Sequence, residues 1–240
     1  MKTLKEFLTE GILDIEDNIE NLSVESLIED FIKENYEIKH GNLQFKKKGD
    51  KYIVSTKGIV LVKNKNITAL TNGVFEWGEV KSFYCVGCTS LQSLKGAPKK
   101  AGDFNCMRCT SLESLKGAPE KVRRDFNCVR CTSLKDLIGA PKEVGWSFSC
   151  RGCTSLESLK GAPEKVGRSF YCSECKSLKD LEGAPEKVDG DFSCEKCISL
   201  KSLEGAPKEV GWDFYCSDCG KKFTEEDVRS VCDVKGKITV

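Results

Sequence analysis

The chain has 240 residues, of which 39% are hydrophobic and 31% charged, and its formal net charge is +1. This composition is typical of a soluble globular protein and gives no overall attraction to nucleic acid or to an anionic membrane. No apolar run approaches the ~20 residues of a membrane span, and the N-terminus lacks the apolar core and cleavage site of a secretory signal. We therefore expect a cytoplasmic protein that binds no membrane, and nucleic acid is not the favoured partner.

The first 22 residues predict a helix followed by an acidic linker. Thr3 and Glu6 stand at the spacing of a capping box, and apolar residues over 3–13 recur with helical periodicity. The stretch 14–22 is rich in carboxylates and separates this helix from the body of the chain. Two interpretations remain open: the helix folds back onto the neighbouring cap, or it serves as a docking peptide.

Residues 23–58 predict an N-terminal cap made of a helix and a β-hairpin. Ser23 is a suitable N-cap for a helix whose apolar face is formed by Val24, Leu27, Ile28 and Phe31. From residue 36 the sequence alternates as strands do, with a Lys-Gly-Asp turn at 48–50. A cap of this kind is needed because the terminal coil of a repeat stack exposes its core.

The centre of the chain, residues 83–219, contains seven copies of one repeat. The interval between consecutive phenylalanines is 21 residues once and then 22 residues five times, at Phe83, Phe104, Phe126, Phe148, Phe170, Phe192 and Phe214. Two cysteines follow each phenylalanine at a fixed spacing: Cys85 and Cys88, Cys106 and Cys109, Cys128 and Cys131, Cys150 and Cys153, Cys172 and Cys175, Cys194 and Cys197, Cys216 and Cys219. Two leucines come next, and all six prolines lie in the Gly-Ala-Pro turn that follows the leucines. Self-similarity at a fixed period indicates a solenoid.

The physical chemistry of one copy predicts a short strand and a return turn. In Phe126-Asn127-Cys128 the side chains point in, out and in, and Leu134 and Leu137 bring further apolar groups inward. Gly139-Ala140-Pro141 then breaks any regular element. A single coil cannot bury its own apolar face, so the coils stack and their strands form a parallel sheet. The predicted fold class is a mainly β repeat solenoid with a leucine-rich-repeat parallel sheet, an irregular convex side, short N-terminal helices and a hairpin cap.

Residues 59–82 are predicted to be a degenerate first repeat. Aligned at an offset of 24 residues, Leu61 falls on the first cysteine position, Asn64 on the second, and Ile67 and Leu70 on the two leucines. If one position accepts Leu or Cys and the other Asn or Cys, the cysteines belong to a core and a hydrogen-bonding ladder.

Residues 220–240 predict a C-terminal cap. Thr224 is placed to cap a short helix, and Cys232, which has no partner cysteine at the repeat spacing, is expected to lie in this cap with Ile238 and Val240.

The repeat string Phe-x-Cys-x-x-Cys-x-Ser-Leu-x-x-Leu, the N-terminal Leu-Lys-Glu-Phe-Leu and the closing Cys-Gly-Lys-Lys-Phe-Thr-Glu-Glu-Asp-Val resemble leucine-rich-repeat proteins encoded by crAss-like gut bacteriophages. The resemblance covers nearly the whole chain. It implies a solenoid of unassigned biochemical role and, for a phage-encoded chain, the cytoplasm of the host cell. Many such relatives carry Asn in the ladder where this chain carries Cys.

The fifteen cysteines allow three interpretations. Buried structural thiols are favoured, since the apolar residues around every pair already account for the fold, and no cofactor is then required. Zinc is the alternative, because the spacing of the fourteen paired cysteines matches four-cysteine sites, although seven pairs leave one pair over. Disulfides are the third, because adjacent coils lie ~4.8 Å apart.

The leading functional hypothesis is a protein-interaction scaffold that binds an unknown protein partner through the concave strand face. We find no catalytic triad, phosphate loop or paired-carboxylate site and do not expect an enzyme. The alternative is a zinc-binding structural or nucleic-acid-binding protein. The candidate partner-binding residues share outward positions on the strands or just beside them: Tyr84, Asn105, Met107, Arg108, Arg124, Asn127, Arg130, Trp146, Ser149, Arg151, Arg168, Tyr171, Trp212 and Tyr215.

Stacking should align these residues into a polarised surface. The arginines are expected to form one basic patch over the middle coils, and Glu174, Glu195 and Asp218 an acidic end. The alternating Lys and Glu residues after the prolines, such as Lys121 and Glu143, are expected to form stacking pairs on the opposite side.

Overall fold

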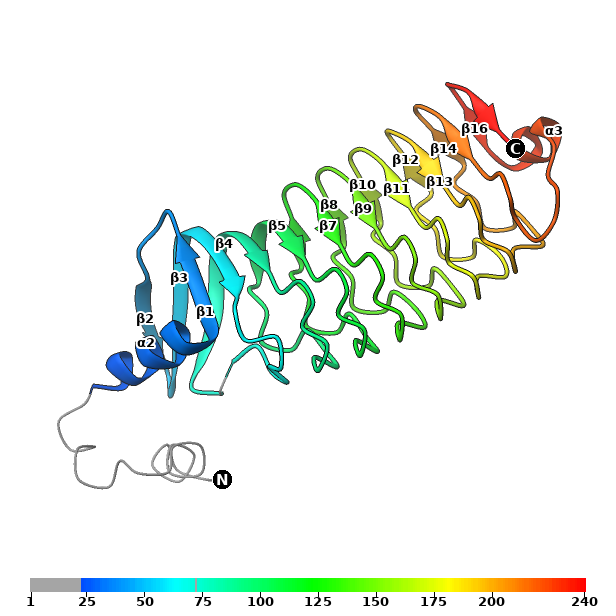
Figure 1. The fold of residues 1–240 in the computed structure, drawn as a ribbon. Helices are drawn as coiled ribbons and strands as arrows, with labels where there is room; N and C mark the ends of the chain where they lie inside the picture. Colours follow the sequence, from blue (N-terminus) through cyan, green and yellow to red (C-terminus); the bar gives the residue numbers. More distant parts are fainter. Residues whose placement is uncertain (1–22, 72) are drawn as a thin grey trace.

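The computed structural model describes residues 23–71 and 73–240, and these residues form a parallel-sheet β-solenoid (Figure 1). The helix predicted over 3–13 and the acidic linker lie outside the described residues. No helix in the described part of the chain is long and apolar enough to cross a membrane.

The N-terminal cap is the predicted helix and hairpin. Helix α2 (Val24–Asn35) begins at Ser23, whose hydroxyl accepts a hydrogen bond from the Ser26 N–H at 3.1 Å. Strands β1 (Tyr36–Lys39) and β2 (Gln44–Lys48) both pair antiparallel with β3 (Lys51–Val62). Strand β3 is also the first strand of the parallel stack, so the cap covers the open end of the solenoid (Figure 1).

Two parallel ladders run along the stack. They start as one ladder in the long strands β4 (Phe75–Tyr84) and β5 (Lys100–Asn105), which pair with each other in parallel. From there each coil contributes two short strands. The valine ladder consists of β6 (Lys121–Val122), β8 (Glu143–Val144), β10 (Lys165–Val166), β12 (Lys187–Val188) and β14 (Glu209–Val210). The phenylalanine ladder consists of β7 (Phe126–Asn127), β9 (Phe148–Ser149), β11 (Phe170–Tyr171), β13 (Phe192–Ser193) and β15 (Phe214–Tyr215).

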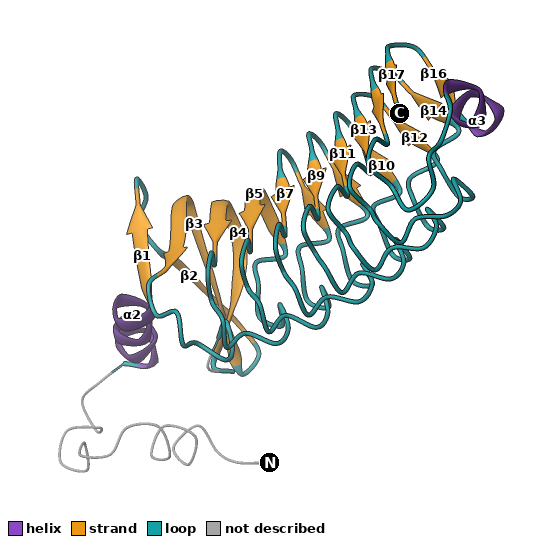
Figure 2. Ribbon diagram, turned by 45° about the vertical axis from the view of Figure 1, so that its right-hand side comes forward, coloured by secondary structure: helices purple, strands orange, loops and turns teal. Residues whose placement is uncertain are grey.

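The chain bends between the two ladders, and the stacked bends form what we call the rounded edge of the solenoid (Figure 2). Side chains that precede each phenylalanine hold the bends together. Asp125 Oδ1 accepts the Ser147 N–H of the next coil at 3.0 Å, and Asp213 Oδ1 accepts the Lys237 N–H at 2.7 Å. The recurring Asp or Ser before each phenylalanine was the sequence signal for this ladder, and the sequence analysis did not use it.

The core is organised around a column of stacked phenylalanine rings. Six successive ring pairs from Phe83 to Phe214 have centroids 5.1–5.7 Å apart, and five of the six are near parallel. All seven rings are fully buried. At the N-terminal end the column continues into Tyr36 of β1 and Trp77 of β4. Such pairs contribute about 0.5–1.5 kcal/mol each beyond the burial of apolar area.

The leucine side of each coil is irregular, as expected, but it is tied to its neighbours by the same kind of main-chain bonds. Leu137 N–H donates to Lys160 O at 2.9 Å, and Glu157 N–H donates to Lys135 O at 2.9 Å. Because both sides of the stack therefore have the spacing of hydrogen-bonded strands, the solenoid is nearly straight (Figures 1 and 2). The strand side, which we expected to be concave, is nearly flat.

The predicted alignment of the degenerate repeat was wrong by one residue along its strand. Val60 pairs with Phe83 and Leu61 with Tyr84, so Val62, which is 2% exposed, takes the first cysteine position. Asn64 is exposed and bonds to the side chain of Asn35 instead of joining a ladder. Ile67 and Leu70 are buried as predicted, because this coil has one residue fewer between strand and first leucine.

The C-terminal cap contains an incomplete eighth coil. Helix α3 (Glu225–Val231) starts at Thr224 with a capping box to Asp227, as predicted. Strand β16 (Asp233–Val234) then joins the valine ladder beside β14, and β17 (Ile238–Thr239) joins the phenylalanine ladder beside β15. Ile238 thus covers the last ring of the column, and the 24-residue spacing of Val210 to Val234 and of Phe214 to Ile238 was the overlooked signal.

Replacing a ring in the middle of the column should destabilise the fold severely. Phe148→Ala removes a fully buried ring that stacks on two others, and we expect a loss of about 3–5 kcal/mol in the free energy of unfolding by urea. The control is Ser149→Ala on the outer face of the same strand, for which a change within about 0.5 kcal/mol is expected. Equal losses for both variants would contradict the column's role.

Two glycines with positive φ should respond differently to Ala. At Gly139, in the Gly-Ala-Pro turn, φ is +92° and an added Cβ would lie 2.5 Å from the Lys116 main-chain nitrogen of the preceding coil. At Gly87 φ is +70° and the space is open. Gly87→Ala should cost about 1–2 kcal/mol for the left-handed backbone alone, and Gly139→Ala clearly more, as measured by thermal unfolding. If Gly139→Ala lost less stability than Gly87→Ala, the two coils would be able to move apart at this turn without a cost in free energy.

Candidate interaction surface

The paired cysteines form a ladder of thiol hydrogen bonds inside the stack. In six successive coils the second cysteine donates its S–H to the main-chain carbonyl of the first cysteine in the preceding coil, at 3.0–3.3 Å: Cys109, Cys131, Cys153, Cys175, Cys197 and Cys219 are the donors. These carbonyls lie just beyond the strands, and four of them also accept the main-chain N–H of the second cysteine in their own coil at 3.2–3.4 Å: those of Cys85, Cys106, Cys128 and Cys150. The favoured structural interpretation thus has direct support that does not depend on Asn64.

The same arrangement keeps the first cysteine of several coils protonated. A hydrogen bond to the Cys131 thiol and burial together raise the pKa of Cys106 well above its usual range, and Cys128 and Cys150 are raised in the same way by Cys153 and Cys175. Zinc binds thiolates. Residues 23–71 and 73–240 contain no group of three or more His, Cys, Asp or Glu side chains arranged to hold a metal ion.

The outer strand column consists of the residues that follow the phenylalanines: Tyr84, Asn105, Asn127, Ser149, Tyr171, Ser193 and Tyr215. The structure places them side by side in parallel register, as predicted. Asn105 and Asn127 have a structural task as well, since their Oδ1 atoms accept the N–H of Met107 and of Val129 at 2.9 and 3.0 Å. Their amides are therefore only partly available to a partner.

The residue before each second cysteine has a left-handed backbone. Arg108 and Arg130 have φ values of 59° and 58°, and Gly87 and Gly152 occupy the same position in other coils. Both arginines are exposed and line a shallow groove of about 540 Å³ together with Thr110 and Thr132. They lie at the far end of the strands from the rounded edge.

The single basic patch expected from the sequence is not formed. Arg124 lies on the rounded edge before β7, and Arg130 lies in the turn beyond the other end of this two-residue strand. Arg124 is paired with Asp103, and Arg151 with Glu174, its Nε lying 3.0 Å from Glu174 Oε1. The prediction was wrong because it treated the bend as part of one flat strand, left out Asp103, and assigned Glu174 to a separate acidic end.

The predicted Lys–Glu pairs do form between coils, on the valine ladder. Lys121 pairs with Glu143, and Lys187 Nζ lies 3.0 Å from Glu209 Oε1. The ladder that carries them is separated from the phenylalanine ladder by the bend.

The rounded edge carries what we call the edge column, which consists of Arg124, Trp146, Arg168 and Trp212. Trp146 is 43% exposed and Trp212 51%. The Arg168 guanidinium carbon lies 5.8 Å from the centre of each tryptophan ring, and that of Arg124 lies 5.7 Å from Trp146. Arg168 therefore reaches over the intervening coil, where Gly190 places no side chain.

Gly190 is required for that arrangement. A Cβ at this position would lie 2.8 Å from the main-chain carbonyl carbon of Arg168 and from Ser169 Oγ, so no larger residue fits without a shift of the neighbouring coil. Its N–H donates to Arg168 O at 2.8 Å. The backbone under the edge column is thus fixed on both sides of the arginine.

A hollow of about 550 Å³ lies on the strand face near the acidic end of the stack. It contains the predicted residues Ser149, Arg151, Tyr171 and Tyr215. It also contains Glu174 and Glu195 of the predicted acidic end, and five residues that were not among the predicted partner-binding residues: Val129, Ser173, Asp191, Ser193 and Lys196. Its carboxylates accept hydrogen bonds from neighbouring hydroxyls, for example Glu195 Oε1 from Ser217 at 3.0 Å.

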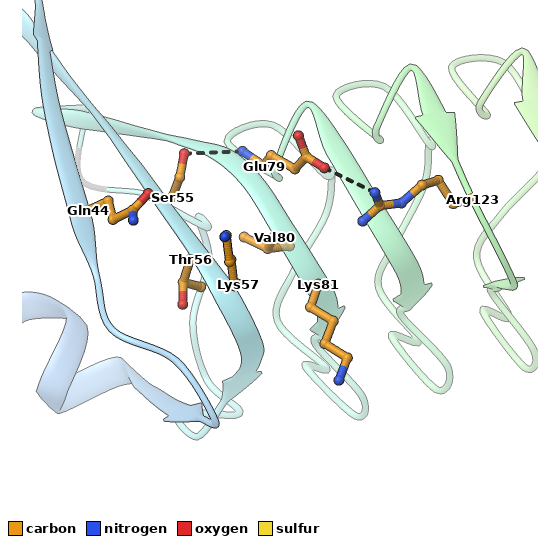
Figure 3. A pocket seen from close by; sticks show the side chains of 8 residues that line it. All are labelled: Gln44, Ser55, Thr56, Lys57, Glu79, Val80, Lys81 and Arg123. Atoms are coloured by element: carbon orange, nitrogen blue, oxygen red, sulfur yellow. Dashed lines mark hydrogen bonds and ion pairs between the residues drawn. The ribbon is translucent and has the colours of Figure 1, made fainter.

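A second hollow, of about 540 Å³, lies beside the N-terminal cap at the start of the rounded edge (Figure 3). Glu79 bridges its upper rim, with its N–H donating to Ser55 Oγ at 3.3 Å and its carboxylate 3.3 Å from Arg123. Lys57 and Lys81 line the hollow and have no ion-pair partner among the described residues (Figure 3). No sequence motif marked this place, because it joins β3 and β4 to a residue two coils away.

Comparison of the chain with protein-family models, with curated proteins and with solved structures finds no match.

The ladder of thiol donors predicts that folding is independent of metal. Protein purified under reducing conditions should contain far less than one zinc per chain by elemental analysis, and a chelator should leave its thermal midpoint unchanged, since the thiols already donate to carbonyls. Stoichiometric zinc together with a chelator-induced loss of stability would restore the zinc alternative.

Proposed function

We propose that this protein is a non-enzymatic protein-interaction scaffold, which binds a protein partner through the edge column and the adjoining strand face. The observation that carries the proposal is the edge column itself, in which two exposed tryptophans flank an arginine. Trp and Arg are the residue types most enriched among the side chains that dominate binding energy at interfaces. Exposed tryptophan is otherwise unfavourable, because large apolar surface in water costs free energy.

The charge state of the column supports the same proposal. Arg168 has no carboxylate within ion-pair distance among the described residues, whereas Arg124 is paired with Asp103. The exposed Arg168 guanidinium is thus available to a carboxylate of a partner, in the bidentate geometry that arginine favours. The tryptophan rings on either side limit its motion, which reduces the entropy lost on binding.

The rigidity of the platform also favours binding over catalysis. Each residue of the edge column stands on a bend that is hydrogen-bonded to both neighbouring coils; Trp146 N–H donates to Arg124 O at 3.1 Å, and Arg168 N–H to Trp146 O at 3.0 Å. A pre-organised surface of this kind binds without first having to order itself. In the strand-face hollow, the carboxylate of Glu195 accepts from structural hydroxyls.

We further propose a cytoplasmic location. All fifteen cysteines are free thiols, and a protein that keeps so many thiols reduced suits a reducing compartment.

The edge column can be tested by affinity capture from native host cells with matched variants. Trp146→Ala combined with Trp212→Ala should reduce capture of the partner by at least about tenfold, since hot-spot residues contribute 2 kcal/mol or more each. Ile138→Ala combined with Ile198→Ala is the control, because these side chains are also exposed apolar groups, at 39% and 60%, but lie outside the edge column.

Arg168→Glu should abolish capture while leaving the thermal midpoint within a few degrees of the wild type, because Arg168 has no ion pair in the described structure to lose. If the tryptophan and arginine variants capture the partner as well as the wild type does, the edge column is not the binding surface. If the control pair fails equally, the loss of capture comes from apolar surface in general.

A further inference from the structure

The thiol ladder ends at Cys219, and this end differs from the rest. All fifteen cysteines lie in the described residues, and Cys219 is the one that is partly exposed; the other fourteen are buried. Every earlier donor of the ladder is covered by the following coil. The eighth coil supplies only β16 and β17 and has no second cysteine, so nothing of that kind covers Cys219.

Cys219 is in contact with Cys194 of the preceding coil. Its Sγ lies 3.3 Å from Cys194 O, so the two residues stand side by side at the end of the ladder. In the ionised state Cys219 accepts the S–H of Cys194. This hydrogen bond from Cys194 lowers the pKa of Cys219 and raises the pKa of Cys194, so the two thiols are chemically different.

The other nearby cysteines do not share this contact. Burial raises the pKa of Cys216 to about 12 and that of Cys197 above its usual range, and neither thiol hydrogen-bonds to the Cys219 side chain. The charged groups around Cys219 are Asp218 and Glu195, whose carboxylates oppose ionisation, so the hydrogen bonds and not the surrounding charge favour the thiolate.

We propose that Cys219 and Cys194 form a peroxide-sensitive thiol pair, in which exposed Cys219 is the nucleophile and buried Cys194 resolves the product. The Cys219 thiolate attacks a peroxide oxygen, the O–O bond breaks, and Cys219 becomes a sulfenic acid while the leaving oxygen departs as hydroxide or alkoxide. The Cys194 sulfur then attacks the Cys219 sulfur, an S–S bond forms, the S–O bond breaks, and water leaves with the Cys194 proton. The peroxide is reduced and the two thiols are oxidised together by two electrons.

The reaction begins at this end of the ladder because the Cys219 thiol is accessible to solvent. Oxidants reach partly exposed, low-pKa thiols first, and structural buried thiols are inert until the fold opens. The pairs Cys106 with Cys131 and Cys128 with Cys153 have the same diagonal contact, but all four of these side chains are fully buried. The pair at the end of the ladder is therefore the one that combines contact with access.

The proposal is tested on the full reduced chain with about one equivalent of hydrogen peroxide, followed by thiol blocking, digestion without reductant and mass spectrometry. The expected product has lost two hydrogens and yields one linked peptide pair that joins Cys194 to Cys219. Before oxidation, a thiol-alkylating reagent should modify Cys219 at least about tenfold faster than any other cysteine of the folded protein. A link from Cys219 to Cys197 or Cys216, or first oxidation at another cysteine, would overturn the assignment.

Two variants separate the roles of the pair. In Cys194→Ser the sulfenic acid on Cys219 should persist and be trapped by dimedone, since no resolving thiol is left. Cys232→Ser is the control: Cys232 lies in the same cap, but burial raises its pKa to about 11, and its loss should leave the Cys194–Cys219 product unchanged. Absence of a dimedone adduct in a folded Cys194→Ser protein would contradict the nucleophilic role of Cys219.

Discussion

Main-chain hydrogen bonds hold each coil of this solenoid to the next in one fixed register, with Phe126 beside Phe148 and Val122 beside Val144. Because side chains alternate between the two faces of a strand, a slip of one residue would turn every ring of the column outward. The same register brings each second cysteine under a carbonyl of the coil before it, and it brings Trp146 beside Arg124. The core, the thiol ladder and the candidate binding surface are therefore consequences of one pairing pattern.

The repeat made the solenoid predictable, since identical intervals leave only one way to stack identical apolar faces. The degenerate coil was predictable only in part. Ile67 and Leu70 keep the leucine spacing, but one residue is missing between strand and leucine, and an ungapped alignment therefore misplaced Leu61 and Asn64. The curvature was not predictable from the consensus either, because it depends on the spacing of coils on the leucine side, where the hydrogen bonds are made by irregular backbone.

The candidate binding surface could also be predicted from the sequence only in part. Composition and position identified Trp146, Arg168 and Trp212, but they gave no sign that the chain bends just there. A one-residue difference explains it: Ala101 stands three residues before Phe104 and β5 runs unbroken, whereas Val122 stands four residues before Phe126 and the strand divides in two. The added residue of the 22-residue interval thus creates the rounded edge and separates Arg124 from Arg130.

Gly190 occupies the one coil between Arg168 and Trp212, and the number of coils sets the distance between the two tryptophans of the edge column. Trp146 and Trp212 stand three coils apart, about 14 Å at the spacing of paired strands, and Arg168 spans the coil in which glycine leaves the edge bare. The core of every coil packs only on its neighbours, so a whole 22-residue unit added or lost beside Gly190 would preserve the core and change this distance by one step. The number of repeats between the two tryptophans thus sets the distance between them. Duplication or loss of one repeat can change that distance during evolution while the fold stays the same.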